Sequence, residues 1–365
     1  MKEINVGIIT FHRAVNYGAV LQTYALQKAL EKINVRSEVI DYRDNIIENR
    51  FKFFYNKSLK RFVRDLLYYP VFSSKNKKFE FFLKNYIKTT DKIYTNNEQL
   101  KALQDFDKYI TGSDQVWNYK LTKWDKAYFL NFVKDNYKKC SYAASFGLNE
   151  IPSKEKDEYI KLLSQFNQIS VRESKGAEIV YSLLKRRGMV DLDPTLLLDK
   201  KEWSSIAKIP KEKDYILVFV MQKNDSTFKF AEELAKKKNC DIVYISDSLK
   251  RRVKAKYKYS VSPDEWLGYF LNAKYIITNS FHGLAFSINL NKDFFIELQR
   301  EPATGNSRLE NMLDTFNLRE RLIVNAKNDN VDKKIDWNKV NKKMEECRQS
   351  SMSNLKKICF DLEEE

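Results

Sequence analysis

The stretch AKYIITNSFHGLAFSINLNKDFFI, residues 273–296, contains the pattern that decides the fold. An apolar run at residues 274–278 predicts a buried strand, and the polar turn after it leads into a segment with helical spacing that starts after Phe281. A second apolar run at residues 293–296 predicts another strand. Two strands joined through a helix pair in parallel by a right-handed crossover, so this stretch predicts an α/β fold.

The same alternation of strand and helix runs through both halves of the chain. In the first half, strands are expected at residues 5–11, 35–42, 109–111, 140–146 and 168–171, with helices from residue 20 and at 154–166 and 173–184. The pattern restarts with strands at residues 215–221 and 241–245 and helices at 227–238, 263–271 and 307–316. Ser262 followed by a proline marks the start of the 263–271 helix.

The length of 365 residues is too great for one typical core and predicts two domains. Pro194 interrupts regular structure between the halves, so we place an N-terminal domain at residues 1–198 and a C-terminal domain at 199–330. Residues 331–365 are expected to form a helix that crosses back onto the first domain. We therefore predict two Rossmann-like, doubly wound domains that face each other across a cleft, as in the GT-B architecture, with the carboxyl ends of the strands lining the cleft.

The composition narrows the class of protein. No apolar stretch approaches the roughly 20 residues that cross a bilayer, and the opening strand-like segment is too short for a secretory signal. We therefore expect a cytoplasmic protein that contacts lipid only peripherally, at the inner face of the membrane. The four cysteines lie far apart without C-x-x-C spacing, which predicts free thiols and no metal site.

Half of the net charge of +16 falls within residues 42–88, which carry 12 Lys or Arg against 4 Asp or Glu, together with 13 aromatic residues. We interpret residues 43–88 as a basic, aromatic, helical insert of the N-terminal domain. The composition is compatible with an anionic membrane surface. It is also compatible with amphipathic helices that pack by their aromatic faces, whereas a nucleic-acid partner is not expected.

The turn after residue 278 holds the strongest catalytic candidate. His282 is one of only two histidines in the chain, and histidine titrates near neutral pH. Its position at a strand-to-helix turn is where open α/β sheets build their sites. We expect His282 to act as general acid and base, with Ser280 and Gly283 beside the substrate and the glycine allowing close approach of a ligand.

Three further turns in the first half follow predicted strands. In the turn at residues 13–19, small residues and a helix start favour an anion near Asn16 and Gly18, although Asn16 also suits a simple helix cap. His12, just before this turn, is expected to assist catalysis or to take no part in it, rather than to act as the base. The turns at residues 111–118 and 141–147 are polar strand ends that supply Ser113, Asp114 and Ser145 as substrate-binding candidates.

Arg172 lies between a predicted buried strand and a helix. A guanidinium at such a point can bind a carboxylate or a phosphate through two parallel hydrogen bonds. The alternative is an exposed salt bridge with Glu173 or another neighbour.

Taken in order, these turns resemble the polysaccharide pyruvyl transferase family. The resemblance covers roughly residues 5–321 and depends on five segments: NYGAVLQ (16–22), GSDQVW (112–117), SVRE (170–173), DPT (193–195) and HG (282–283). It implies the GT-B architecture and a donor substrate, phosphoenolpyruvate. Because the sequence contains no evident metal-ligand cluster, we expect a reaction that uses no metal and no resident cofactor. The pyruvyl group would pass to two hydroxyls of a cell-surface polysaccharide or of its lipid-linked precursor, leaving a ketal and inorganic phosphate.

The family's histidine corresponds to His282 and its mid-chain arginine to Arg172. Many members carry Asp-Arg-Leu ahead of the histidine, where this chain has Asn279-Ser280-Phe281. We expect Arg308, at a later helix start, to supply the missing cation. The sequence leaves two other functions open: a GT-B glycosyltransferase that uses a nucleotide sugar, and a basic module that binds glycan or nucleic acid.

Overall fold

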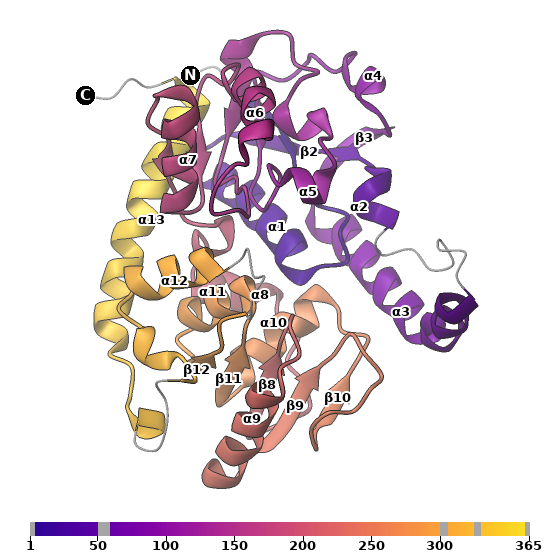
Figure 1. Ribbon diagram of the computed structural model, residues 1–365, viewed down its shortest axis with the longest axis vertical. Helices are drawn as coiled ribbons and strands as arrows, with labels where there is room; N and C mark the ends of the chain where they lie inside the picture. The colour runs from indigo at the N-terminus through magenta and orange to yellow at the C-terminus, as the bar shows by residue number, and fades with distance from the viewer. Residues whose placement is uncertain (1–3, 50–58, 300–305, 325–329, 362–365) are drawn as a thin grey trace. The chain divides into compact units, whose positions relative to one another are not determined.

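The computed structural model describes residues 4–49, 59–299, 306–324 and 330–361, and it divides into two compact units. The first comprises residues 1–52, 83–198 and 346–365, and the second residues 53–82 and 199–345. Each unit contains a parallel five-stranded sheet with helices between its strands (Figure 1).

The sheet of the first unit has the strand order β3-β2-β1-β4-β5. Its central strand β1 (Asn5–Ile9) is flanked by β2 (Arg36–Tyr42) and β4 (Lys108–Thr111), so that Ile8 pairs with Val39 on one side and Ile110 on the other. Strands β3 (Thr89–Tyr94) and β5 (Lys139–Ser141) complete it. Isolated bridges from Cys140 and Ala144 extend the order toward β6 (Ser170–Val171) and β7 (Met189–Val190).

The helices of the first unit lie between these strands in the chain. They are α1 (Tyr17–Lys32), α2 (Asn45–Asn49), α4 (Asn97–Leu100), α5 (Tyr119–Thr122), α6 (Lys156–Leu163) and α7 (Ser174–Leu184). A buried aromatic cluster fills the core, in which the Trp117 ring lies 5.2 Å from the Phe146 ring and 5.5 Å from the Phe166 ring. The turn at residues 111–118 thus buries its tryptophan in the core of the first unit.

The second unit repeats this plan with the order β10-β9-β8-β11-β12. Its central strand β8 (Tyr215–Phe219) has the sequence YILVF and is buried along its whole length, as expected where helices cover both faces of a parallel sheet. The other strands are β9 (Asp241–Ile245), β10 (Lys256–Lys258), β11 (Tyr275–Thr278) and β12 (Asp293–Ile296). Its helices are α8 (Lys200–Ile206), α9 (Asp225–Lys238), α10 (Pro263–Asn272), α11 (Phe281–Asn289) and α12 (Asn306–Thr315).

One helix departs from the expected domain plan. Helix α3 (Leu59–Tyr86), in the basic aromatic segment, packs as far as Phe82 with the second unit and not with the N-terminal domain to which the sequence analysis assigns it. In this placement the Lys78 ammonium binds the carbonyl of Ser260 and the carboxylate of Glu265 in the second unit. The basic residues at 50–58 lie outside the described residues.

Helix α13 (Trp337–Phe360) belongs to the first unit from Glu346 onward (Figure 1). There Asn354 donates a hydrogen bond to Asp191 at 2.9 Å, and the Ser351 hydroxyl accepts one from the Leu192 amide. The C-terminal part of α13 therefore lies beside the carboxyl end of β7, in the short sheet that β7 forms with β6.

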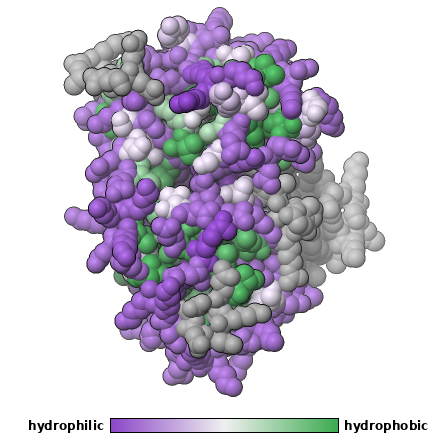
Figure 2. Space-filling model, turned by 60° about the vertical axis from the view of Figure 1, so that its left-hand side comes forward, coloured by the Kyte–Doolittle hydropathy of each residue, from purple (hydrophilic) through white to green (hydrophobic). Residues whose placement is uncertain are grey.

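The surface matches the hydrophilic composition, which has a mean hydropathy of −0.56. Figure 2 shows one face on which hydrophilic side chains dominate and hydrophobic ones form separate groups. Among the described residues, no helix is both long enough and apolar enough to span a bilayer.

Candidate active site

In each unit, the strand order reverses beside the central strand. These points lie between β1 and β4 in the first unit and between β8 and β11 in the second. Ligands of open α/β sheets bind outside the carboxyl ends of the strands at such points. The candidate residues are therefore described unit by unit at those ends.

In the second unit, Asn279 ties the ends of β8 and β11 together. Its side-chain oxygen accepts hydrogen bonds from the amides of Met221 (2.7 Å) and Gln222 (3.3 Å), and its Nδ2 donates to the Gln222 carbonyl at 2.6 Å. The Thr278 hydroxyl adds a bond to the Phe219 carbonyl at 2.6 Å. This network fixes the backbone from which the next helix begins.

His282 lies in the first turn of α11, where Ser280 is the N-cap and accepts a hydrogen bond from the Gly283 amide at 3.3 Å. The histidine is 8% exposed. Its ring stands perpendicular to that of Phe281, with the centroids 5.1 Å apart. The sequence therefore places this imidazole correctly at a helix N-terminus, where backbone amides and the helix dipole favour an anion.

Gly283 has a different role from the one that the sequence suggests. A Cβ atom at this position would lie 3.0 Å from Cβ and 3.2 Å from Cγ2 of Thr278, and closer still to Oγ1. The space beside Gly283 is thus filled by Thr278 and not left open for a ligand. The glycine allows α11 to begin directly against the end of β11.

Arg308 lies on α12 in the same unit, and its guanidinium carbon is 5.6 Å from the centroid of the Phe281 ring. Phe281 thus contacts both Arg308 and His282. The start of α12 is anchored nearby, because Asn306 exchanges two hydrogen bonds with the backbone of Gln299, whose side chain donates to the Asn279 carbonyl at 3.1 Å. The structure therefore brings the predicted acid-base residue and the predicted cation to one edge of the second sheet.

In the first unit, Asn16 is the N-cap of α1 and accepts hydrogen bonds from the amides of Gly18 (2.9 Å) and Ala19 (3.3 Å). The turn therefore forms a capped helix start. The adjoining crevice between β1 and β4 is filled by Gln22, which donates to the Thr10 hydroxyl at 2.9 Å and accepts from the Ser113 amide at 3.1 Å.

Arg172 is buried, with a side chain that is 1% exposed, and it lies among three carboxylates. Its Nη1 donates to Asp193 at 2.9 Å, and other guanidinium nitrogens lie 3.7 Å from Asp114 and from Glu173. Burial alone would lower the pKa of the guanidinium, but the carboxylates, Asp193 first, raise it. The alternative interpretation is thus right about the partners, since Arg172 pairs with Glu173 and other neighbours, but wrong about exposure, since these ion pairs are buried. The anion that accepts a hydrogen bond from the guanidinium is the Asp193 carboxylate.

Ser113 and Ser145 complete the same network. Ser113 donates to Asp193 at 3.1 Å, and Ser145 donates to Glu173 at 2.7 Å. The predicted residues Ser113, Asp114 and Ser145 are thus brought together around Arg172. The sequence analysis names Glu173 as a possible partner of Arg172 but misses Asp193, although both lie in the segments quoted for the family resemblance.

His12 is also buried, between two acceptors. Its Nδ1 lies 3.3 Å from the Thr10 carbonyl and its Nε2 lies 3.5 Å from Asp41. Burial would raise the pKa of Asp41, yet the hydrogen bonds from His12 and Arg43 hold it well below its usual range. Within the described ranges, no group of three or more potential ligands could hold a metal ion.

Comparison with known proteins identifies the family. The sequence profile described as polysaccharide pyruvyl transferase matches residues 16–296, more than three quarters of the chain. The chain belongs to the polysaccharide pyruvyl transferase family. It is therefore a transferase by family, and the matched region contains Asn16, Asp114, Arg172 and His282 but ends before Arg308.

Solved structures support the fold class. A protein described as a UDP-N-acetylglucosamine 2-epimerase from Listeria monocytogenes is 11% identical, with a TM-score of 0.53 over 99% of this chain and 98% of that one. A second UDP-N-acetylglucosamine 2-epimerase has the same identity and TM-score over 100% and 98%. At this identity the likeness shows the fold alone, and it confirms two Rossmann-like domains of the GT-B type. No curated protein sequence matches the chain.

Proposed function

We propose that this member of the family transfers a pyruvyl group from phosphoenolpyruvate to two hydroxyls of a cell-surface polysaccharide or its lipid-linked precursor. The observation that carries the proposal is the placement of His282 and Arg308 against one aromatic ring at the carboxyl edge of the second sheet. Phosphoenolpyruvate carries a phosphate and a carboxylate on one carbon. It therefore needs two elements that recognise anions.

The N-terminus of α11 and the guanidinium of Arg308 supply these elements in the proposal. Backbone amides of the first turn suit the phosphate, and an arginine suits the carboxylate because the planar guanidinium can donate two parallel hydrogen bonds. Ser280, which stands where many family members have arginine, caps the helix instead. Arg308 would thus take over the cationic role from the neighbouring helix.

His282 would move the protons. The protonated imidazole gives a proton to the methylene carbon of the donor, which becomes a methyl group and leaves a cationic centre on the adjacent carbon. A sugar hydroxyl attacks that carbon and returns its proton to His282. The carbon–oxygen bond to phosphate then breaks, the second hydroxyl closes the ketal, and its proton leaves with the phosphate.

Arg172 has a positioning role in this proposal. Three carboxylates already surround its guanidinium, so an anionic donor would have to displace one of them or add to a site with excess negative charge. We assign Arg172 to holding Asp114 and Glu173 in place. Asp114, whose side chain is 13% exposed, is then the member of the cluster best able to contact a sugar hydroxyl.

The direct test is incubation of the purified protein with phosphoenolpyruvate and a panel of free and lipid-linked glycans. Release of phosphate together with a pyruvyl mass on the glycan supports the proposal. Release of a nucleotide from a nucleotide sugar, with no reaction of phosphoenolpyruvate, would instead support the glycosyltransferase.

Variants assign the roles. Replacing His282 with glutamine should lower kcat by roughly 100-fold or more, because general acid-base catalysis contributes this much. Arg308→Ala should raise KM for phosphoenolpyruvate by at least tenfold. Arg319→Ala is the matched control, since Arg319 lies in the same unit but pairs with Asp314 at the surface. An unchanged KM in Arg308→Ala would remove that residue from the donor site.

We also propose that the acceptor is presented at an anionic membrane surface. The segment 42–88 carries a surplus of eight positive charges, and Leu66 on α3 is 59% exposed. Flotation with anionic liposomes tests this point. Failure to bind at low salt would contradict it.

A further inference from the structure

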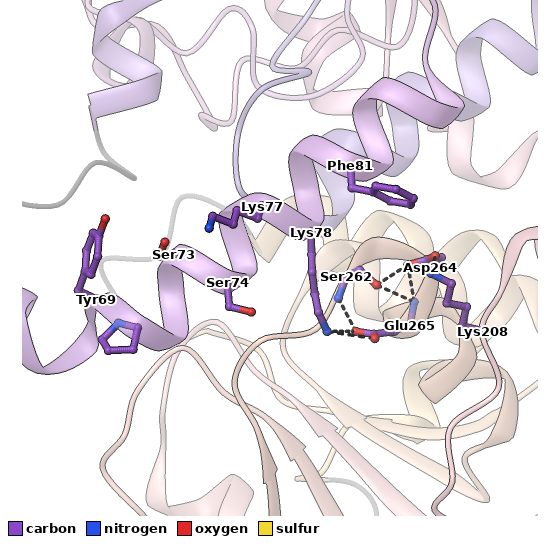
Figure 3. Close-up of a pocket in the computed structure, with 11 residues that line it drawn as sticks. Tyr69, Ser73, Ser74, Lys77, Lys78, Phe81, Lys208, Ser262, Asp264 and Glu265 are labelled. Atoms are coloured by element: carbon purple, nitrogen blue, oxygen red, sulfur yellow. Dashed lines mark hydrogen bonds and ion pairs between the residues drawn. The ribbon is translucent and has the colours of Figure 1, made fainter.

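Helix α3 and the start of α10 line an open pocket of about 670 Å³ within the second unit (Figure 3). The volume falls within the range of sites that bind small molecules. The pocket is lined on one side by α3 and on the other by the first turn of α10 and Lys208. None of the residues assigned above to donor or proton chemistry lines it.

Specific polar contacts hold the two sides together. Lys78 donates to the Ser260 carbonyl at 2.8 Å and to both oxygens of Glu265 at 3.0 and 2.8 Å. The Ser260 hydroxyl donates to Ser74 at 2.9 Å. Glu265 also accepts from the Ser262 amide as part of a capping box, so the wall of the pocket is braced by the start of α10.

The charges of the lining are largely neutralised within it. Lys78 pairs with Glu265, and Lys208 pairs with the buried Asp264 at 2.7 Å. Lys77 is the exposed lysine that remains on the α3 side. A strongly anionic ligand would therefore meet two carboxylates and little uncompensated positive charge.

Two exposed aromatic side chains stand at opposite ends of the pocket. Tyr69 is 48% exposed and Phe81 is 60% exposed, and Figure 3 shows them at either end of the labelled part of α3. Twelve residues separate them on a helix, which corresponds to roughly 18 Å along its axis. The hydroxyls of Ser73, Ser74 and Ser262 lie in the lining as well.

We infer that this pocket binds an oligosaccharide stretch of the glycan acceptor, away from the sugar that reacts, and this inference rests on the proposed function. Sugar rings present an apolar face of C–H groups that packs on aromatic rings. Their hydroxyls both donate and accept hydrogen bonds, as serine, lysine and carboxylate side chains require. The spacing of Tyr69 and Phe81 suits a chain of several sugars better than one sugar, and the balanced charge suits an uncharged chain.

The test uses the 365-residue protein and an array of cell-surface oligosaccharides, followed by calorimetric titration of the glycans that bind. Tyr69→Ala and Phe81→Ala should each weaken binding about tenfold. Phe81→Tyr, which keeps a ring, should retain the affinity. Ser73→Trp, which fills the pocket, should abolish binding, whereas Tyr181→Ala, at an exposed tyrosine on α7, should have no effect.

Activity distinguishes failure of this inference from failure of the proposed function. If both hold, the pocket variants raise KM for long glycan acceptors and leave KM for phosphoenolpyruvate unchanged. If glycan binding depends on Tyr69 and Phe81 but no pyruvyl group is transferred, the proposed donor reaction is wrong, whereas the inference that the pocket binds glycan is supported. The inference that this pocket binds glycan is refuted if these variants change the binding of no glycan on the array. It is also refuted if the protein binds anionic vesicles but no glycan.

Discussion

Gly283→Ala tests whether the packing of α11 against β11 positions the catalytic turn. The added methyl group would meet the Thr278 side chain at 3.0 Å from Cβ and 3.2 Å from Cγ2, and closer to Oγ1. Thr278 has little freedom to move, since β11 pairs with β8 and β12 on its two sides. Overpacking of this kind costs about 1–3 kcal/mol.

For a unit of this size, that cost corresponds to a fall of about 2–12 °C in the melting temperature. Because His282 precedes the glycine, kcat should fall as well. Thermal unfolding followed by circular dichroism measures the stability, and phosphate release measures the activity.

A second substitution isolates the cause. Thr278→Ala removes both Oγ1 and Cγ2, at the expense of the hydrogen bonds to Phe219 and from Ser280. In the Thr278→Ala variant, Gly283→Ala should reduce the free energy of unfolding by at most half as much as it does in the native protein. An equal reduction in both proteins, or no reduction in the native protein, would refute the argument that Thr278 occupies this space.

Three further perturbations have defined outcomes. Lys78→Met should change the global stability by less than about 1 kcal/mol, because the pair with Glu265 is partly exposed, but should speed amide hydrogen exchange along α3. Arg172→Met should destabilise the protein by about 3–5 kcal/mol in urea unfolding, since it leaves buried carboxylates without their cation. Burial raises the pKa of Asp191 to about 6, against hydrogen bonds that lower it, so the folded state favours the protonated acid. The stability of the native protein relative to Asp191→Asn should therefore fall as pH rises from near 3.8 to about 6, and a flat difference would contradict this sign.

The local sequence is sufficient to predict an element where the residue pattern directly reflects how that element is buried. The continuous apolar run of β8 reflects a strand covered on both faces, and it was readable without any knowledge of its neighbours. Ser262 and the following proline likewise marked the start of α10, where the structure shows a capping box. The position of His282 at a helix start followed from the same kind of local pattern.

Contacts between distant residues could not be predicted in this way. Nothing near Lys78 in the sequence indicates that its partner is Glu265, 187 residues later, so α3 was assigned to the wrong unit. Arg172 was interpreted from its strand-end position alone, and its closest partner Asp193 comes from another turn. The role of Gly283 depends on the side chain of Thr278, which a pattern of residue types does not reveal.

The assignment of α3 to the second unit has a consequence for synthesis on the ribosome. Lys78 emerges 187 residues before Glu265, and at typical elongation rates this delay is on the order of ten seconds or more. During that interval the amphipathic, lysine-rich helix lacks the part of the second unit against which it packs in the folded protein. A nascent chain would thus expose aromatic side chains such as Phe79 and Phe82, which are buried in the folded protein. A chaperone or the lipid surface could bind these side chains until the second unit is complete.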